Sequence, residues 1–250
     1  MLAALRADLR AARERDPAAR STAELVLCYP GLHAVWGHRA SNWLWRHGRT
    51  LLARVCSSVT LRLTGVDIHP AALLGAGLFI DHATGVVIGE TAEVGADVTI
   101  YHGVTLGGTS LEHGKRHPTV GDRVTIGAGA KVLGPITIGH DSRIGANAVV
   151  VKPVPPDSVV VGVPGRVIMR AHARASTEPV DLDNAVLPDV VGVSLRALHD
   201  RIEALESALD GAAAPRPASP RPAGPRPASP SSASPRSADT EVWYEEDFSI

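Results

Sequence analysis

The chain has 250 residues, of which 44% are hydrophobic, 20% charged and only 4% aromatic, and its formal net charge is -1. This balance is typical of a globular protein and gives no basis for a nucleic-acid partner, which an excess of positive charge would indicate. No apolar run approaches the roughly 18 residues that a membrane span requires, and the two cysteines, Cys28 and Cys56, favour a reducing compartment, so we expect no membrane partner and a cytoplasmic location.

Residues 1–64 are predicted to be helical, because leucines recur at helical spacing from the first turn onward. Ser21 followed by Glu24 fits a capping box at the start of a helix, and Pro30–Gly31 predicts a turn. The residues after that turn form one helical stripe: Leu32, Val35, Trp36, Arg39, Trp43 and Arg46. We interpret the tryptophans of this region as packing groups rather than as ligand contacts.

Over residues 65–168 the hydrophobic period changes to six, which is neither the 3.6 of a helix nor the 2 of an ordinary strand. An aliphatic residue followed by glycine recurs at Leu74–Gly75, Ile88–Gly89, Val94–Gly95, Leu106–Gly107, Val120–Gly121, Ile126–Gly127, Ile138–Gly139 and Ile144–Gly145. This hexapeptide period is typical of a parallel β-helix, in which three hexapeptides make one triangular coil. The coils stack at roughly 4.8 Å, and the inward aliphatic residues form the core without many aromatic residues.

The period is interrupted twice. Ile80 and Ile88 are eight residues apart where six would suffice, and Leu106 and Val120 are fourteen apart where twelve would suffice. The stretch 109–119 lacks the pattern, so we predict a loop there. It is polar and basic, and loops on rigid scaffolds often carry function.

The C-terminal part of the chain divides into four segments. Residues 169–193 are expected to be an extended connection, and 194–210 a helix with the leucine rhythm of a short coiled-coil seam. Residues 211–240 consist almost entirely of Ala, Pro, Arg and Ser, which predicts a disordered linker. Residues 241–250 form an acidic and aromatic motif that ends in Ile250.

Several motifs together resemble the serine O-acetyltransferases, in their short form, within the hexapeptide-repeat acyltransferase family. They are RDPAAR at 15–20, DIHPAA at 67–72, DHATGVVIGET at 81–91, VTLGGT at 104–109, KRHP at 115–118, IGAGAKVLG at 126–134 and VPGR at 163–166. The resemblance implies an α+β fold, with N-terminal helices followed by a left-handed parallel β-helix. It also implies acetyl transfer from acetyl-CoA to the hydroxyl of L-serine, the first step of cysteine biosynthesis, with acetyl-CoA as co-substrate and no bound cofactor or metal.

The same resemblance assigns roles to individual residues. His82 would be the catalytic base, oriented by Asp67, and their separation of fifteen positions is close to one eighteen-residue coil. The serine zwitterion would be held by Asp16 and Asp81 at its amine and by Arg116 and His117 at its carboxylate. The residues implied in CoA binding are Gly108, Ala128, Arg143 and Ala146. Neither cysteine falls in these motifs, so direct transfer without an acyl-enzyme is expected.

The resemblance further implies partners and leaves alternatives open. A homotrimer is favoured over a hexamer, L-cysteine is expected to inhibit, and O-acetylserine sulfhydrylase is expected to bind the C-terminal Ile250. The alternatives are a hexapeptide acyltransferase acting on a sugar or antibiotic hydroxyl, and a zinc hydratase of the γ-carbonic anhydrase type that would use His82, His102 and His117. A non-catalytic scaffold is the third alternative.

Overall fold

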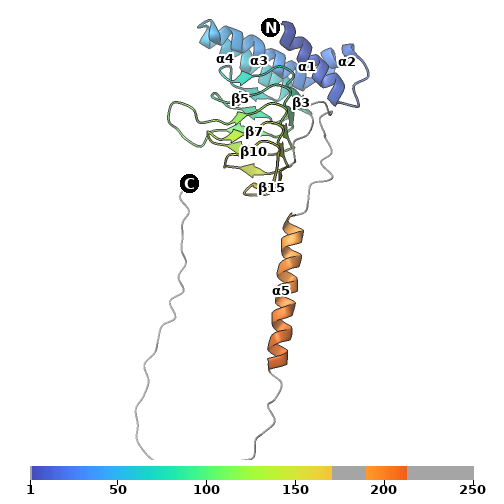
Figure 1. The fold of residues 1–250 in the computed structure, drawn as a ribbon. Coiled ribbons are helices and arrows are strands. Elements are labelled where there is room, and N and C mark those ends of the chain that lie inside the picture. The colour runs from blue at the N-terminus through green and yellow to red at the C-terminus, as the bar shows by residue number, and fades with distance from the viewer. Residues whose placement is uncertain (1, 171–189, 213–250) are drawn as a thin grey trace, which may run out of the picture. The chain divides into compact units, whose positions relative to one another are not determined.

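The computed structural model describes residues 2–170 and 190–212, and it has a layer of helices followed by a parallel β-helix (Figure 1). Four helices form the N-terminal layer: α1 (Leu2–Arg15), α2 (Thr22–Cys28), α3 (Pro30–Arg46) and α4 (Thr50–Thr64). The predicted N-terminal helical region is therefore confirmed. The predicted linker 211–240 and the motif 241–250 lie outside the described residues, apart from the end of the last helix.

The capping box is confirmed in a modified form. Ser21 Oγ accepts a hydrogen bond from the Glu24 amide at 3.1 Å, but the Glu24 carboxylate accepts from the Arg20 amide instead of from Ser21. The predicted turn at Pro30–Gly31 is wrong, because the chain breaks at Tyr29 alone and Pro30 already begins α3. Proline is well suited to this first helical position, where its missing N–H would have no partner.

The β-helix consists of three sheets, one on each side of a triangular prism, and the strands of successive coils pair parallel in each of them. One sheet, here called sheet A, contains β1 (Asp67–Ile68), β4 (Val87–Ile88), β7 (Thr105–Gly107), β10 (Lys131–Leu133) and β13 (Val149–Val150). Sheet B contains β2 (Leu73–Leu74), β5 (Glu93–Val94), β8 (Thr119–Val120) and β11 (Thr137–Ile138). Sheet C contains β3 (Phe79–Asp81), β6 (Thr99–Tyr101), β9 (Thr125–Ile126), β12 (Arg143–Ile144), β14 (Ser158–Val161) and β15 (Arg166–Arg170).

The predicted period of six corresponds to columns of buried aliphatic side chains. The column of sheet A is Ile68, Ile88, Leu106, Val132 and Val150, each paired in register with the next. That of sheet C is Ile80, Ile100, Ile126, Ile144 and Val160. All these side chains are at most 4% exposed, so the hexapeptide core is confirmed.

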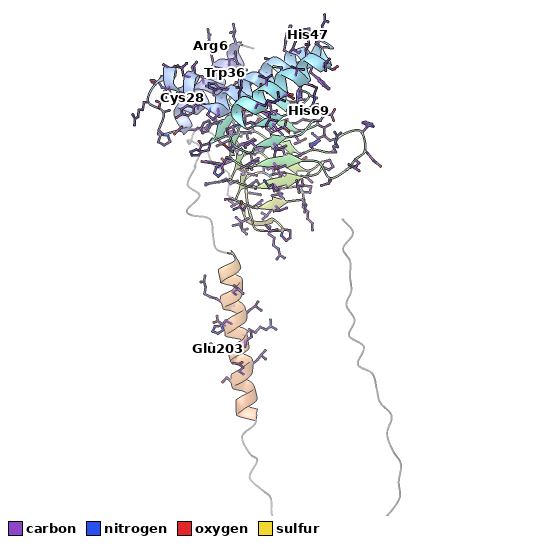
Figure 2. All side chains as sticks on the ribbon, turned by 180° about the vertical axis from the view of Figure 1, so that it is seen from behind. Arg6, Cys28, Trp36, His47, His69 and Glu203 are labelled. Atoms are coloured by element: carbon purple, nitrogen blue, oxygen red, sulfur yellow. The ribbon has the colours of Figure 1, made fainter. Side chains whose placement is uncertain are left out.

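The helical layer is fixed to the first coil by polar as well as apolar contacts. Asp8 of α1 accepts two hydrogen bonds of 2.7 Å from Arg39 of α3, and it also accepts from the Gly77 amide at 3.0 Å. Figure 2 shows Trp36 and Cys28 within this layer and His69 where the β-helix begins. Trp36 packs against a cluster of buried side chains from α1, α2, α3 and β3, which supports its interpretation as a packing group.

The far end of the β-helix and the last helix complete the described structure. β15 turns back and pairs antiparallel with β14, in contrast to the parallel pairing of the coils. The helix α5 runs from Val190 to Ala212, so it begins and ends outside the predicted bounds 194–210. Its apolar seam is exposed at Leu195, Leu198, Ile202 and Leu205. No helix within residues 2–170 or 190–212 is long and apolar enough to cross a membrane.

Candidate active site

His82 lies on the corner that joins β3 to β4, where the hexapeptide period is interrupted. Both His82 and Ala83 have positive φ angles, of 56° and 53°, a backbone region that few residues other than glycine adopt. Ala83 is completely buried, whereas the His82 side chain is 77% exposed. The two additional residues of this corner thus hold an imidazole outside the prism, where a substrate can reach it.

The corners of the next three coils stack in line with His82. We call this column the His82 corner, and it consists of residues 82–86, 102–104, 127–130 and 145–148. Backbone hydrogen bonds join its levels, from the Gly129 amide to His102 and from the Asn147 amide to Ala128. The structure thus brings the predicted residues Ala128 and Ala146 into line with His82. It also places His102 between them, with ring centroids of His82 and His102 5.9 Å apart.

Among the described residues, no hydrogen bond or ion pair joins Asp67 to His82, although the resemblance implies that the two side chains form a pair. Asp67 pairs in register with Val87, beyond the corner, and its side chain is exposed on the outer face of sheet A. The carboxylate recorded close to His82 is that of Asp81, with Oδ2 4.0 Å from Nε2. The orienting role of Asp67 therefore stays a prediction.

Arg116 and His117 lie at the corner on the opposite edge of sheet A. We call it the Arg116 corner, and it consists of residues 69–72, 89–92 and 108–118. The last of these ranges contains most of the predicted loop 109–119, whose final residue Thr119 instead begins β8, and it projects from the side of the prism (Figure 1). Arg116 donates from Nη2 to the Glu90 carboxylate at 2.5 Å, and this hydrogen bond lowers the pKa of Glu90. Glu90 was not predicted as a site residue, although it stands inside the motif DHATGVVIGET.

The contacts of His117 define its tautomer. Its Nδ1 accepts from the Thr91 amide at 3.2 Å and lies 2.9 Å from the Thr91 hydroxyl, so the proton of the neutral ring is on Nε2. Burial is the largest cause that lowers the pKa of His117, and the neighbouring Arg116 lowers it further. A Cβ added at Gly89 would lie 2.1 Å from Nε2, so only glycine leaves room for this ring. His117 is thus a neutral donor whose N–H faces two glycines, Gly89 and Gly108.

The predicted residues for the serine amine lie near the end of β3, where α3 begins. Asp16 follows α1, and its Oδ2 accepts a hydrogen bond of 2.6 Å from the Tyr29 hydroxyl. The hydrogen bond that Tyr29 donates to Asp16 is the largest cause that raises the pKa of Tyr29 to about 12, and Asp81, the last residue of β3, contributes to the same rise. Tyr29 was missed at the sequence level, because nothing in its spacing connects it with Asp16.

The remaining predicted residues divide between the two corners. Gly108 lies at the Arg116 corner, where a Cβ would approach the Arg116 side chain to 3.2 Å. Arg143 lies on β12 of sheet C, two strands away from β6, which carries Tyr101. Burial raises the pKa of Tyr101, and the charge of Arg143 partly opposes this rise. A cavity of about 340 Å³ beside the Arg116 corner is lined by residues that include Trp45, Glu90 and Lys115. Among the residues that the structure describes, no group of His, Cys, Asp and Glu side chains could hold a metal ion.

Comparison with known proteins gives matches along the whole chain. Residues 1–36 match the family model "Serine acetyltransferase, N-terminal", and residues 117–152 match "Bacterial transferase hexapeptide (six repeats)". The chain is 59% identical over 250 residues to a serine acetyltransferase of Mycobacterium tuberculosis, covering 100% of both chains. It is 52% identical over 215 residues to one of Synechococcus elongatus, covering 86% of each.

Three solved structures of similar proteins contain small molecules. A serine acetyltransferase of Neisseria gonorrhoeae in complex with serine has a TM-score of 0.65 and 49% identity, covering 67% of this chain and 69% of that one. One of Brucella abortus in complex with coenzyme A has a TM-score of 0.67 and 47% identity, covering 69% of each. A further serine acetyltransferase in complex with cysteine has a TM-score of 0.67 and 44% identity, covering 68% of this chain and 66% of that one.

Proposed function

Because the chain belongs to the serine acetyltransferase family, we propose that His82 is the general base of an acetyl transfer from acetyl-CoA to L-serine. The family membership makes the protein an acyltransferase that uses acetyl-CoA as co-substrate and forms O-acetyl-L-serine and CoA. The observation that carries the role of His82 is its position on a strained corner, with an exposed imidazole and the Asp81 carboxylate 4.0 Å away.

The reaction requires a proton to move twice. The serine hydroxyl gives its proton to His82 while its oxygen attacks the thioester carbonyl, and the tetrahedral intermediate then expels the CoA thiolate. The protonated His82 then gives this proton to the CoA thiolate, which restores the neutral base. Backbone N–H groups of the corner turns are suitable donors to the oxyanion. Asp67, on the neighbouring coil, is proposed to stabilise the imidazolium once the site is assembled.

Recognition of serine is proposed to use both charges of the zwitterion. Asp16 and Asp81 hold the ammonium group, and Arg116 with the Nε2–H of His117 holds the carboxylate. Glu90 keeps the Arg116 guanidinium in place before serine binds, since the two are joined at 2.5 Å. The acetyl-CoA arm is proposed to follow the small residues Ala128 and Ala146, towards Arg143, and to contact Gly108.

The distribution of these residues favours a site shared between copies of the chain. His82 and Arg116 lie at corners on opposite edges of sheet A, because His82 precedes the sheet A strand β4 whereas Arg116 follows the sheet A strand β7. Serine is only a few bonds across and cannot touch both corners of one prism. A homotrimer, in which the His82 corner of one copy faces the Arg116 corner of the next, brings the two sets together.

Mixed oligomers test this arrangement directly. His82→Ala and Arg116→Ala chains are each expected to be inactive alone, whereas refolding them together should restore part of the activity through sites that receive both wild-type residues. No gain on mixing, with trimers confirmed by light scattering, would contradict the shared site. A hexamer in the same measurement would contradict the choice of a trimer but not the shared site.

Two binding partners complete the proposal. L-cysteine has the same charged groups as serine, so it is proposed to compete at the same residues. Unchanged initial rates at low serine with millimolar cysteine would contradict this.

O-acetylserine sulfhydrylase is proposed to bind the C-terminal Ile250, because a terminal carboxylate beside an apolar side chain suits capture by backbone N–H groups. Equal binding by the full-length chain and by a chain lacking Ile250 would contradict this role.

The decisive experiment is an acetyl-CoA turnover assay with a panel of L-amino acids, sugars and antibiotic hydroxyl compounds, with CoA release as the readout. Release with L-serine alone, and identification of O-acetyl-L-serine, is the expected result. Turnover with a sugar hydroxyl and none with serine would favour the alternative acyltransferase. The two unpaired cysteines, Cys28 and Cys56, are consistent with the proposed cytoplasmic location.

A further inference from the structure

The backbone at the start of α3 lies so close to the end of β3 that a side chain on α3 would not fit between them. A Cβ added at Gly31 would lie 1.9 Å from the Ile80 carbonyl oxygen, so the absence of a side chain permits this contact. Tyr29 immediately precedes this helix and Asp81 immediately follows Ile80. The close approach thus holds the residue before α3 next to the carboxylate that ends β3.

The Tyr29 ring is fixed by apolar contacts. It packs against a cluster of buried residues that joins the helices to the β-helix: Ala11, Ala12, Leu25, Leu32 and Phe79. A ring held on this cluster has little freedom to move its hydroxyl. The hydroxyl points to Asp16, with Oη 2.6 Å from Oδ2.

Asp16 has a second anchor but lacks a cation among its recorded contacts. Its Oδ1 accepts from the Ala18 amide at 2.8 Å, which fixes the other end of the carboxylate. Two neutral donors therefore orient Asp16 while its negative charge is left for a ligand. An ionised carboxylate can accept about four hydrogen bonds, so positions remain for an ammonium group.

We infer that Tyr29 is a positioning residue for substrate recognition, which holds the Asp16 carboxylate towards the ammonium group of the amino-acid substrate. This inference rests on the proposed function and deepens it, because it names the group that orients one of the two amine-binding carboxylates. The raised pKa of Tyr29, about 12, keeps the hydroxyl protonated throughout the pH range of an assay. The donor is therefore present whenever serine binds.

The test is a double-mutant cycle of Tyr29→Phe and Asp16→Asn in the full chain. Phenylalanine keeps the ring on the apolar cluster and removes only the hydroxyl. The KM for serine should rise about tenfold in Tyr29→Phe, as expected for a lost hydrogen bond to a charged group, whereas the KM for acetyl-CoA should stay unchanged. In the Asp16→Asn background, Tyr29→Phe should add little to the KM for serine.

An amine-free ligand separates positioning from a general structural role. 3-Hydroxypropanoate has the hydroxyl and carboxylate of serine but no ammonium group, so its inhibition constant should be the same in the wild type and Tyr29→Phe. A structural defect would instead weaken both ligands and lower the melting temperature.

Four results would overturn the inference: an unchanged KM for serine in Tyr29→Phe, equal effects of Tyr29→Phe in both backgrounds, an unchanged KM for serine in Asp16→Asn, or a loss of 3-hydroxypropanoate affinity in Tyr29→Phe as large as the rise in the KM for serine. A wild-type chain that fails to acetylate serine would instead refute the proposed function, and the two failures are thereby distinguished.

Discussion

Removal of the Asp8 carboxylate should destabilise the protein far more than removal of a similar carboxylate at the surface. Asp8 is 0% exposed and its partner Arg39 is 12% exposed, so Asp8→Asn leaves a buried guanidinium without its counter-charge. Breaking one side of a buried ion pair costs about 3–5 kcal/mol, and we expect the lower end because the amide oxygen still accepts a hydrogen bond. For a chain of this size, about 3 kcal/mol corresponds to a fall in melting temperature of roughly 6–12 °C.

Asp141→Asn is the matched control, because Asp141 also pairs with an arginine at close distance. Its Oδ1 and Oδ2 lie 2.7 and 2.6 Å from Arg123 nitrogens, but the two side chains are 32% and 44% exposed. An exposed pair contributes at most about 1 kcal/mol, so its melting temperature should change little. Thermal unfolding followed by circular dichroism at one protein concentration compares the two variants. Equal shifts for Asp8→Asn and Asp141→Asn would refute the argument from burial.

Three further predictions follow from single residues. His82→Ala should lower turnover by roughly 10²–10⁴-fold with an unchanged melting temperature, since the ring is exposed; turnover close to wild type would exclude it as the base. Gly31→Ala should destabilise by about 1–3 kcal/mol in denaturant unfolding, because the new Cβ meets the Ile80 carbonyl; an unchanged midpoint would contradict that close contact. His38 is buried, and desolvation first, then Arg39, lowers its pKa from 6.5 to about 4. Because the pKa is lowered in the folded state, the contribution of His38 to the free energy of unfolding is fully present above pH 6.5, and roughly 3 kcal/mol is lost as the pH falls to 4. His38→Gln should remove this part of the pH dependence in unfolding experiments.

The repetitive part of the fold is predictable from the sequence because its determinants are local. Each inward aliphatic residue and each corner glycine recurs every six residues, so the column from Ile80 to Val160 can be found without a structure. The loop between Leu106 and Val120 is visible for the same reason, as a gap in the period. The period does not determine how separate helices pack onto the first coil.

The candidate site is only partly predictable. The motifs identify His82, Arg116 and His117, but they do not reveal that sheet A separates His82 from the other two within one chain. The contacts of Tyr29 with Asp16 and of Glu90 with Arg116 join residues without a fixed spacing. Pro30–Gly31 was misinterpreted because this dipeptide is typical of turns, whereas here proline begins a helix and glycine makes room for the Ile80 carbonyl.

The antiparallel pairing of β15 with β14 has a consequence for how molecules of this protein meet one another. A stack of parallel coils exposes unpaired N–H and C=O groups on its last strand, where a second molecule could add and continue the stack into a fibre. β15 occupies that edge along the length of β14, and its reversed direction does not continue the coil. At the opposite end the helices α3 and α4 pack against the first strands β3 and β1. The last strand of sheet C is thereby unavailable for end-to-end growth, and the helical layer covers the first strands of sheets A and C.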